Sequence, residues 1–127
     1  MRGLSRTVII SFLLILGIGI FSGRYSRFIS DEMRGQVRLM EQYVQEEQWD
    51  EAVRMAEEME KTWRGRGDVL SMWVNHDDVD AVSAGLLRLR TALNARDGFH
   101  SLLYAVELRE AVSHVYHRDS LQLKNIL

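Results

Sequence analysis

The sequence contains no cysteine and no proline, and its formal charge is nearly balanced at −2. Without cysteine the chain can form neither a disulfide framework nor a thiolate metal site. Cysteine usage therefore does not indicate whether the protein resides in an oxidising or a reducing compartment. Proline breaks helix interiors, so its absence from 127 residues, with only nine glycines, favours long helices over a turn-rich β fold. The near-neutral charge argues against a dedicated nucleic-acid-binding protein, which is usually strongly basic.

Common catalytic motifs are also missing. The sequence has no Gly-x-Ser-x-Gly elbow, no phosphate-binding glycine loop and no cysteine nucleophile. Adjacent acids, such as Glu46 with Glu47 and Glu57 with Glu58, diverge on a helix instead of converging on a substrate. We therefore expect a protein that is not an enzyme and that uses no cofactor.

A long uncharged run lies near the amino terminus, from Thr7 to Gly23. As a helix it reaches roughly 25 Å, near the lower limit for crossing a bilayer core. A buried helix in so small a globule is rarely apolar on every face. We predict a transmembrane anchor over residues 1–23 that contacts the lipid bilayer through residues 7–23.

The alternative for this segment is a cleaved signal peptide, because Arg2 and Arg6 form a basic region before the apolar stretch. The end of the stretch has no Ala-x-Ala type site, although Gly17 and Gly19 are small enough to permit cleavage.

The positive charges around the run bear on its orientation. Arg2 and Arg6 favour a cytoplasmic amino terminus. Four arginines after the run favour the opposite orientation, with the carboxyl-terminal part in the cytoplasm: Arg24, Arg27, Arg34 and Arg38. Short positive amino termini with one span usually stay inside. We expect a single-pass protein of the cell membrane with its soluble domain outside the cytoplasm.

The remainder, residues 24–127, shows apolar residues at steps of three and four, which is the period of an amphipathic helix. The predicted helices cover residues 25–46, 49–74, 76–94 and 99–117, with a kink or frayed turn near Gly65. Their expected buried stripes are, in chain order, Ile29, Met33, Val37, Met40 and Val44; Ala52, Ala56 or Met55, Met59, Trp63, Arg66, Leu70 and Trp73; Val79, Val82, Leu86, Leu89 and Leu93; and Leu102, Ala105, Val106, Val112, Val115 and Tyr116. Asn75 or His76 is the expected cap of the third helix, and residues 94–98 hold the expected caps between the third and fourth helices. Short connections make neighbouring helices antiparallel. The predicted fold is all-α: a transmembrane helix followed by an antiparallel bundle of three to four helices.

Two features concern the start of this bundle. Only Ser22 and Gly23 separate the anchor from the next helix, so the two can form one rod. The segment 42–63 resembles a tetratricopeptide-type hairpin in its Trp49-x-x-Ala52 spacing, but no 34-residue recurrence supports a repeat array.

Charge is uneven along the chain. Residues 39–80 carry four basic and twelve acidic side chains, a balance of −8. The simple interpretation is the solvated face of two helices, and the alternative is a docking face for a basic partner.

The order of several motifs resembles the family called domain of unknown function 4363 (DUF4363), which comprises small proteins of Firmicutes-type bacteria. The shared features are the amino-terminal span, Gln48-Trp49-Asp50-Glu51-Ala52, Trp63, Trp73-Val74-Asn75-His76-Asp77-Asp78-Val79-Asp80, Leu86-x-x-Leu89 and the ending Ser120-Leu121-x-Leu123-Lys124-Asn125-Ile126-Leu127. The family usually has Asp before the His, where this chain has Asn75. The resemblance supports the predicted architecture of a membrane helix followed by a helical bundle, and it implies no enzymatic reaction.

His76, Asp77 and Asp80 are the most suggestive metal ligands, because His76 and Asp80 share one face of a helix. The spacing matches no zinc or calcium motif, and a third ligand is missing. The competing interpretation places the acids at a helix amino terminus, with His76 beside Trp73. His114, His117 and Asp119 form a weaker second group, better explained by histidines near a helix carboxyl end.

The candidate partner-binding residues are Trp49, Trp73, Leu123, Ile126 and Leu127. The tryptophans lie on apolar stripes, so core packing is the better explanation for them than a ligand pocket. An apolar carboxyl end should dock on the domain itself or on a partner. We expect a structural or interaction module at the bacterial cell envelope that binds another membrane or envelope protein, with homo-oligomers left open and no nucleic acid. The alternative is a divalent-metal or small-ligand sensor built on His76 to Asp80.

Overall fold

The computed structural model describes the backbone of residues 2–126 and the side chains of residues 3 and 5–116. This part of the chain forms four helices: α1 (Arg2–Gln45), α2 (Trp49–Leu70), α3 (His76–Asn94) and α4 (Gly98–Ile126). No strand occurs among these residues. The prediction of an all-α chain with a long apolar helix at its amino terminus is confirmed.

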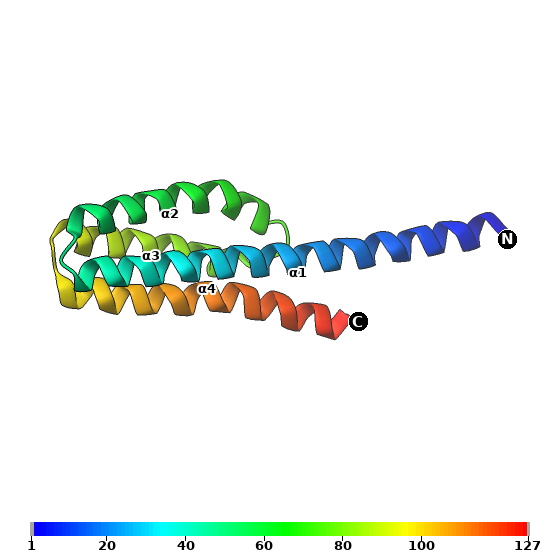
Figure 1. The fold of residues 1–127 in the computed structure, drawn as a ribbon. Coiled ribbons are helices and arrows are strands. Elements are labelled where there is room, and N and C mark those ends of the chain that lie inside the picture. Colours follow the sequence, from blue (N-terminus) through cyan, green and yellow to red (C-terminus); the bar gives the residue numbers. More distant parts are fainter. Residues whose placement is uncertain (1, 127) are drawn as a thin grey trace.

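The four helices form an antiparallel bundle in which each helix has two neighbours. α1 packs against α2 and α4, and α3 packs against the same two helices. The connections are short, so consecutive helices alternate in direction (Figure 1). The carboxyl end of α4 therefore lies on the same side of the bundle as the free part of α1 (Figure 1).

α1 is a single helix of 44 residues, with no break at Ser22 or Gly23. Its first half projects from the bundle, with only the carboxyl end of α4 lying beside its base (Figure 1). We call residues 2–21 the extension. Its second half carries the predicted stripe of core residues, all of which are buried: Ile29, Met33, Val37, Met40 and Val44. The anchor candidate and the first bundle helix are thus one continuous element.

Three serines extend the buried stripe of α1 toward the extension. Ser22, Ser26 and Ser30 follow one another at steps of four, and each is at most 5% exposed. Hydropathy spacing did not predict their burial, because it treats the hydroxyl as a surface group. Small side chains at these positions allow a neighbouring segment to approach the helix closely.

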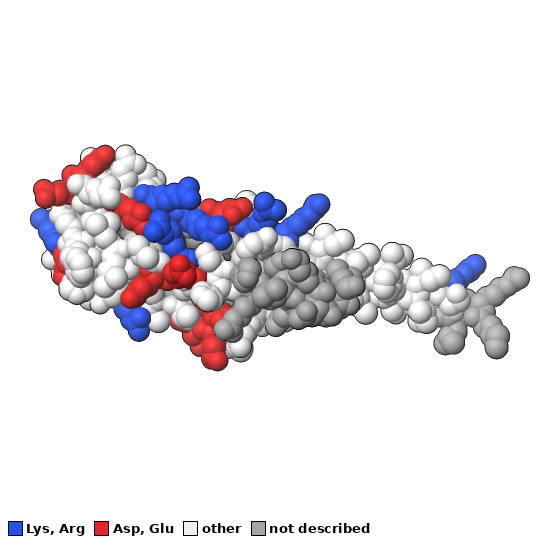
Figure 2. Space-filling model, turned by 90° about the horizontal axis from the view of Figure 1, so that it is seen from below, with Lys and Arg blue, Asp and Glu red and all other residues white. Residues whose placement is uncertain are grey.

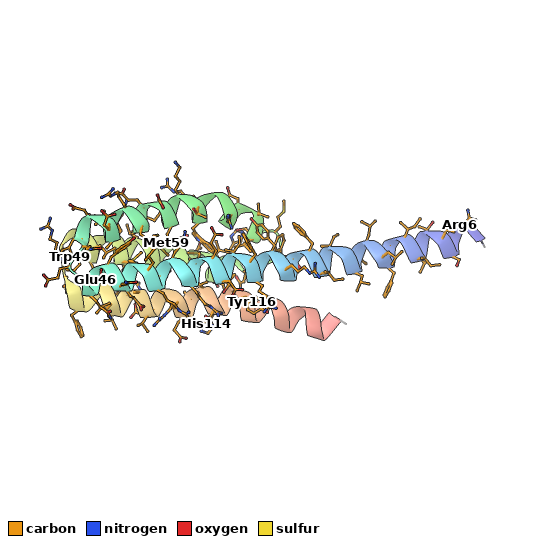
Figure 3. The ribbon with its side chains drawn as sticks, in the orientation of Figure 1. Arg6, Glu46, Trp49, Met59, His114 and Tyr116 are labelled. Atoms are coloured by element: carbon orange, nitrogen blue, oxygen red, sulfur yellow. The ribbon has the colours of Figure 1, made fainter. Side chains whose placement is uncertain are left out.

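Methionine and aliphatic side chains fill the interior. Met59 of α2 points between the helices (Figure 3) and is fully buried. The predicted stripe of α3 is also buried throughout: Val79, Val82, Leu86, Leu89 and Leu93. Trp63 is 3% exposed, and its indole N–H donates to Ser83 Oγ at 3.0 Å. Core packing of Trp63, with its one polar atom satisfied, is confirmed.

The predicted second helix was wrong at three points. α2 passes through Gly65 without interruption and ends at Leu70, four residues before the predicted end. The next residues form a tight turn, in which Met72 N–H donates to Val69 O at 3.1 Å and Val74 N–H donates to Leu70 O at 2.8 Å. The stripe continues through buried Gly67 and not through Arg66.

Helix starts were predicted more accurately. Asn75 caps α3, because its side chain accepts the backbone N–H of Asp77 at 3.0 Å. Asp97 precedes α4, and its Oδ1 accepts the backbone N–H of His100 at 3.0 Å.

The predicted fourth helix was wrong in its end and in part of its buried face. α4 continues to Ile126, beyond the expected end near residue 117. Val106, expected on the buried face, is 45% exposed, whereas Leu108, which was not predicted, is fully buried.

Candidate functional site

The extension exposes nearly all of its apolar side chains. Ten large residues are 52–63% exposed: Val8, Ile9, Ile10, Phe12, Leu13, Leu14, Ile15, Ile18, Ile20 and Phe21. They surround the helix, and no charged side chain interrupts them between Arg6 and Arg24. By length and composition this helix can cross a membrane, a test that an amino-terminal signal sequence also passes.

The surface changes from apolar to charged where the extension enters the bundle. Figure 2 shows charged side chains over the bundle, whereas the visible part of the extension is uncharged until a basic residue close to its end. Exposed Arg24 and Arg27 follow directly after the apolar segment. Arg27 also faces Asp31 one turn later, with 3.9 Å between Nε and Oδ2.

An aromatic cluster lies at the same level. The rings of Phe21 and Tyr25 are stacked on α1 with centroids 5.9 Å apart. Trp73, from the α2–α3 turn, meets both rings edge-on, at 6.5 Å from Phe21 and 5.8 Å from Tyr25. Its indole N–H donates to Ser26 Oγ at 3.3 Å. This cluster joins the α2–α3 turn to the base of the extension.

Arginine–glutamate pairs connect three of the four neighbouring helix pairs. Arg66 of α2 donates to Glu32 of α1 at 2.6 Å and lies over the ring of Phe28, 5.4 Å from its centroid. The other two pairs are Arg90 with Glu60 between α3 and α2, at 3.2 Å, and Arg109 with Glu41 between α4 and α1, at 3.3 Å. These contacts lie along the edges of the helix interfaces and favour one alignment of the helices.

The far end of the bundle is polar. Figure 3 places Trp49 and Glu46 at this end. Glu47 and Arg96 adopt positive φ angles of 58° and 54° in the α1–α2 and α3–α4 turns. An open groove between these turns is lined by Tyr43, Glu47, Gln48, Trp49, Asp50, Glu51 and Arg96. Part of the acidic middle of the sequence thus gathers there, and a basic partner for it stays a prediction.

Asp97 and His100 form a small polar contact nearby. Their side chains are 2.7 Å apart, between Nδ1 and Oδ2. The hydrogen bond from the backbone N–H of His100 has the largest effect and lowers the pKa of the Asp97 carboxyl below its ordinary value of 3.8. Burial opposes this shift, and the His100 side chain lowers the pKa further. This carboxylate acts as a helix cap.

The predicted metal ligands His76, Asp77 and Asp80 are exposed on the first turns of α3. Within the described residues, no group of three or more histidine and carboxylate side chains is placed to hold a metal ion. His114 is exposed on α4, while the side chains of His117 and Asp119 lie outside the described part.

The predicted partner-binding residues divide into two sets. Trp49 and Trp73 are partly buried against the core, so part of each ring remains accessible. The side chains of Leu123, Ile126 and Leu127 lie outside the described residues. Sequence spacing had not indicated that Trp73 lies against the base of the extension.

Comparison with known proteins supports the family resemblance. Residues 20–126 match the family described as Domain of unknown function (DUF4363). No curated protein and no solved structure matches the chain. Because the match includes all four helices of the bundle and most of the chain, the protein belongs to this family.

Proposed function

We propose that the chain is a single-pass membrane protein in which α1 serves both as the bilayer anchor and as the first helix of the bundle. The observation that carries this proposal is the exposure of ten large apolar side chains on all sides of the extension. Moving each such side chain from water into lipid is favourable by roughly 1.5–3 kcal/mol. A bilayer provides this environment around the whole circumference of the helix.

The bundle is proposed to be a non-catalytic structural or interaction module outside the cytoplasm. Its charged groups support this role, since most of its ion pairs join neighbouring helices or neighbouring helical turns. An exposed apolar row on α4 supports contact with another membrane or envelope protein. Phe99, Leu103 and Val106 share one face at steps of four and three, and Phe99 is 73% exposed.

The unbroken α1 gives this module a mechanical property. A flexible linker would allow the bundle to rotate freely above the bilayer. A continuous helix instead transmits rotation and tilt, because every residue of α1 from Arg2 to Gln45 is fixed in helical geometry. The bundle therefore sits at a set height and orientation relative to the anchor.

Single-cysteine labelling tests anchoring and orientation, and the absence of native cysteine gives a clean background. Gly35→Cys places a thiol on the outer face of the bundle, where an added Cβ meets no atom within 4 Å, and Ile15→Cys places one in the extension. In intact cells, a membrane-impermeant maleimide should modify the first variant and not the second.

Two outcomes would contradict the proposal in different ways. Labelling of the Gly35 variant only after permeabilisation would place the bundle in the cytoplasm. Recovery of the protein in the soluble fraction, with the Ile15 variant freely labelled, would exclude the anchor.

A further inference from the structure

We propose that the α2–α3 turn, Ser71–Asn75, is a second membrane contact, in which Met72 enters the hydrocarbon boundary and Trp73 lies at the head-group level. This inference rests on the proposed anchoring of α1. It adds that the bundle is seated on the bilayer surface, and is not held above it by the anchor alone.

The position of the turn is the first reason. The turn lies on the side of the bundle from which the extension emerges, where the carboxyl end of α4 reaches further along α1 than the turn does (Figure 1). Trp73 touches Phe21, the last large apolar residue of the extension, and Tyr25, one turn beyond it. The turn is therefore level with the base of the anchor.

The helical rise places the bilayer boundary at the same level. A hydrocarbon core of about 30 Å corresponds to about 20 residues of an upright helix. Counted from Arg6, the last charge before the apolar run, this length ends near Ser26, and the exposed Arg24 two residues earlier can extend its long side chain to the head groups. Ser26 is the residue whose hydroxyl accepts the indole N–H of Trp73. The anchor and the turn thus reach the water interface together.

The chemistry of the turn fits this location. Met72 is 82% exposed, the highest exposure among the large apolar residues with described side chains. Residues 69–75 carry no charge. Tryptophan is enriched at membrane interfaces, where its ring faces lipid and its N–H remains polar.

The turn is held in a defined shape. Leu70 and Val74 on either side of it are buried, and Val74 N–H donates to Leu70 O at 2.8 Å. Ser71 Oγ also donates to Gly67 O at 2.8 Å. Met72 projects from this fixed turn, so its exposure follows from the fold and little conformational entropy is lost on contact with lipid.

The charges nearby indicate an apolar contact rather than an attraction to anionic lipid. Arg24 and Arg27 are exposed at the base of the extension, but Asp77 and Asp80 are exposed just after the turn on α3. These opposite charges offset one another. Insertion of Met72 is therefore expected in neutral phosphatidylcholine bilayers.

Depth-dependent quenching tests this inference in the full chain reconstituted into phosphatidylcholine vesicles. Met72→Cys, Ile15→Cys and Gln48→Cys are each labelled with an environment-sensitive fluorophore. Gln48 is the matched control, because it is exposed in the α1–α2 turn at the opposite end of the bundle. We expect deep spin-labelled lipid to quench position 15 most and shallow spin-labelled lipid to quench position 72. Position 48 should be quenched only by aqueous iodide.

The outcomes separate the two proposals. Quenching at position 15 by deep lipid, with position 72 behaving like position 48, would overturn the second contact and leave the anchor standing. Shielding of position 72 from both lipid and iodide would show that protein covers the turn, and this result would also overturn the proposed second membrane contact. Iodide access at position 15 would refute the anchor itself. Met72→Ser should leave the unfolding midpoint in detergent unchanged, because the side chain is mostly exposed.

Discussion

Glycines inside helices show how the effect of a single residue depends on its surroundings. Gly65 lies in the interior of α2, and a Cβ added there meets no atom within 4 Å. Gly85 lies inside α3, where a Cβ would approach Leu108 Cδ1 to 3.3 Å. The same substitution therefore has a different balance of backbone entropy and packing at the two sites.

Gly65→Ala is expected to raise the free energy of unfolding by about 0.5–1 kcal/mol, because alanine loses less backbone entropy in a helix. Gly85→Ala is the matched comparison and should give a smaller gain, since the Leu108 side chain must shift. Urea titration in detergent measures the free energy of unfolding of the two variants and of the wild type. A larger gain at Gly85 would contradict the packing described around Leu108.

The Asp97 cap makes stability depend on pH. Folding lowers the pKa of this carboxyl from its ordinary value of 3.8, mainly through the backbone N–H of His100. The stabilisation is present above pH 3.8 and is lost as the pH falls through the lower folded pKa.

Asp97→Asn keeps an acceptor for the cap and removes the charge. We expect the wild type to be more stable than this variant at neutral pH, and the difference to vanish at pH values below the folded pKa. Urea unfolding at neutral pH and at a pH below the folded pKa of Asp97 measures this difference in the free energy of unfolding. An undiminished difference at the lower pH would show that the carboxylate charge is not the cause.

The alignment of helices depends on polar contacts between elements. Arg66 and Glu32, each about one-third exposed, join α2 to α1 near Phe28. Arg54 and Glu51 form a more exposed pair within α2, with 2.7 Å between the charged atoms. Partial shielding from water strengthens the first pair relative to the second.

A double-mutant cycle with Arg66→Ala and Glu32→Ala is expected to show a coupling free energy of up to about 1 kcal/mol, against about 0.3 kcal/mol for the Arg54–Glu51 control. Both values come from urea unfolding and should fall with added salt. Equal coupling in the two cycles would show that the contact between helices has no special role in their alignment.

At the scale of the whole molecule, the two parts of α1 have different roles: its second half belongs to the bundle core, and its first half is exposed. Nearly all buried side chains lie between Ser26 and Val115, whereas the extension contributes only its last turn to the aromatic cluster. The bundle interior is therefore almost complete without the apolar segment.

A fragment of residues 24–127 is expected to remain helical and to unfold cooperatively, while losing stable membrane association, because insertion of the Met72 side chain alone contributes too little to hold the bundle on a bilayer. Circular dichroism with thermal unfolding, and flotation with phosphatidylcholine vesicles, measure the two properties. Loss of Phe21 should lower the unfolding midpoint modestly. An unfolded fragment would show that the extension is part of the folding unit.

The sequence by itself determined the helices, the apolar segment and most of the buried faces. Ile29 to Val44 and Val79 to Leu93 follow the helical period, and Asn75 and Asp97 are strong caps, because these signals depend on residues close together in the chain.

Only the tertiary structure decided the contacts between distant segments. Trp73 leaves the helical stripe after Leu70 and packs on Tyr25, and Ser22, Ser26 and Ser30 are buried despite their hydroxyl groups. Val106 is exposed because it lies on a side of α4 that faces away from both neighbours. Local periodicity indicates that a face is apolar, but the packing of neighbouring elements determines which residues are covered, and by what.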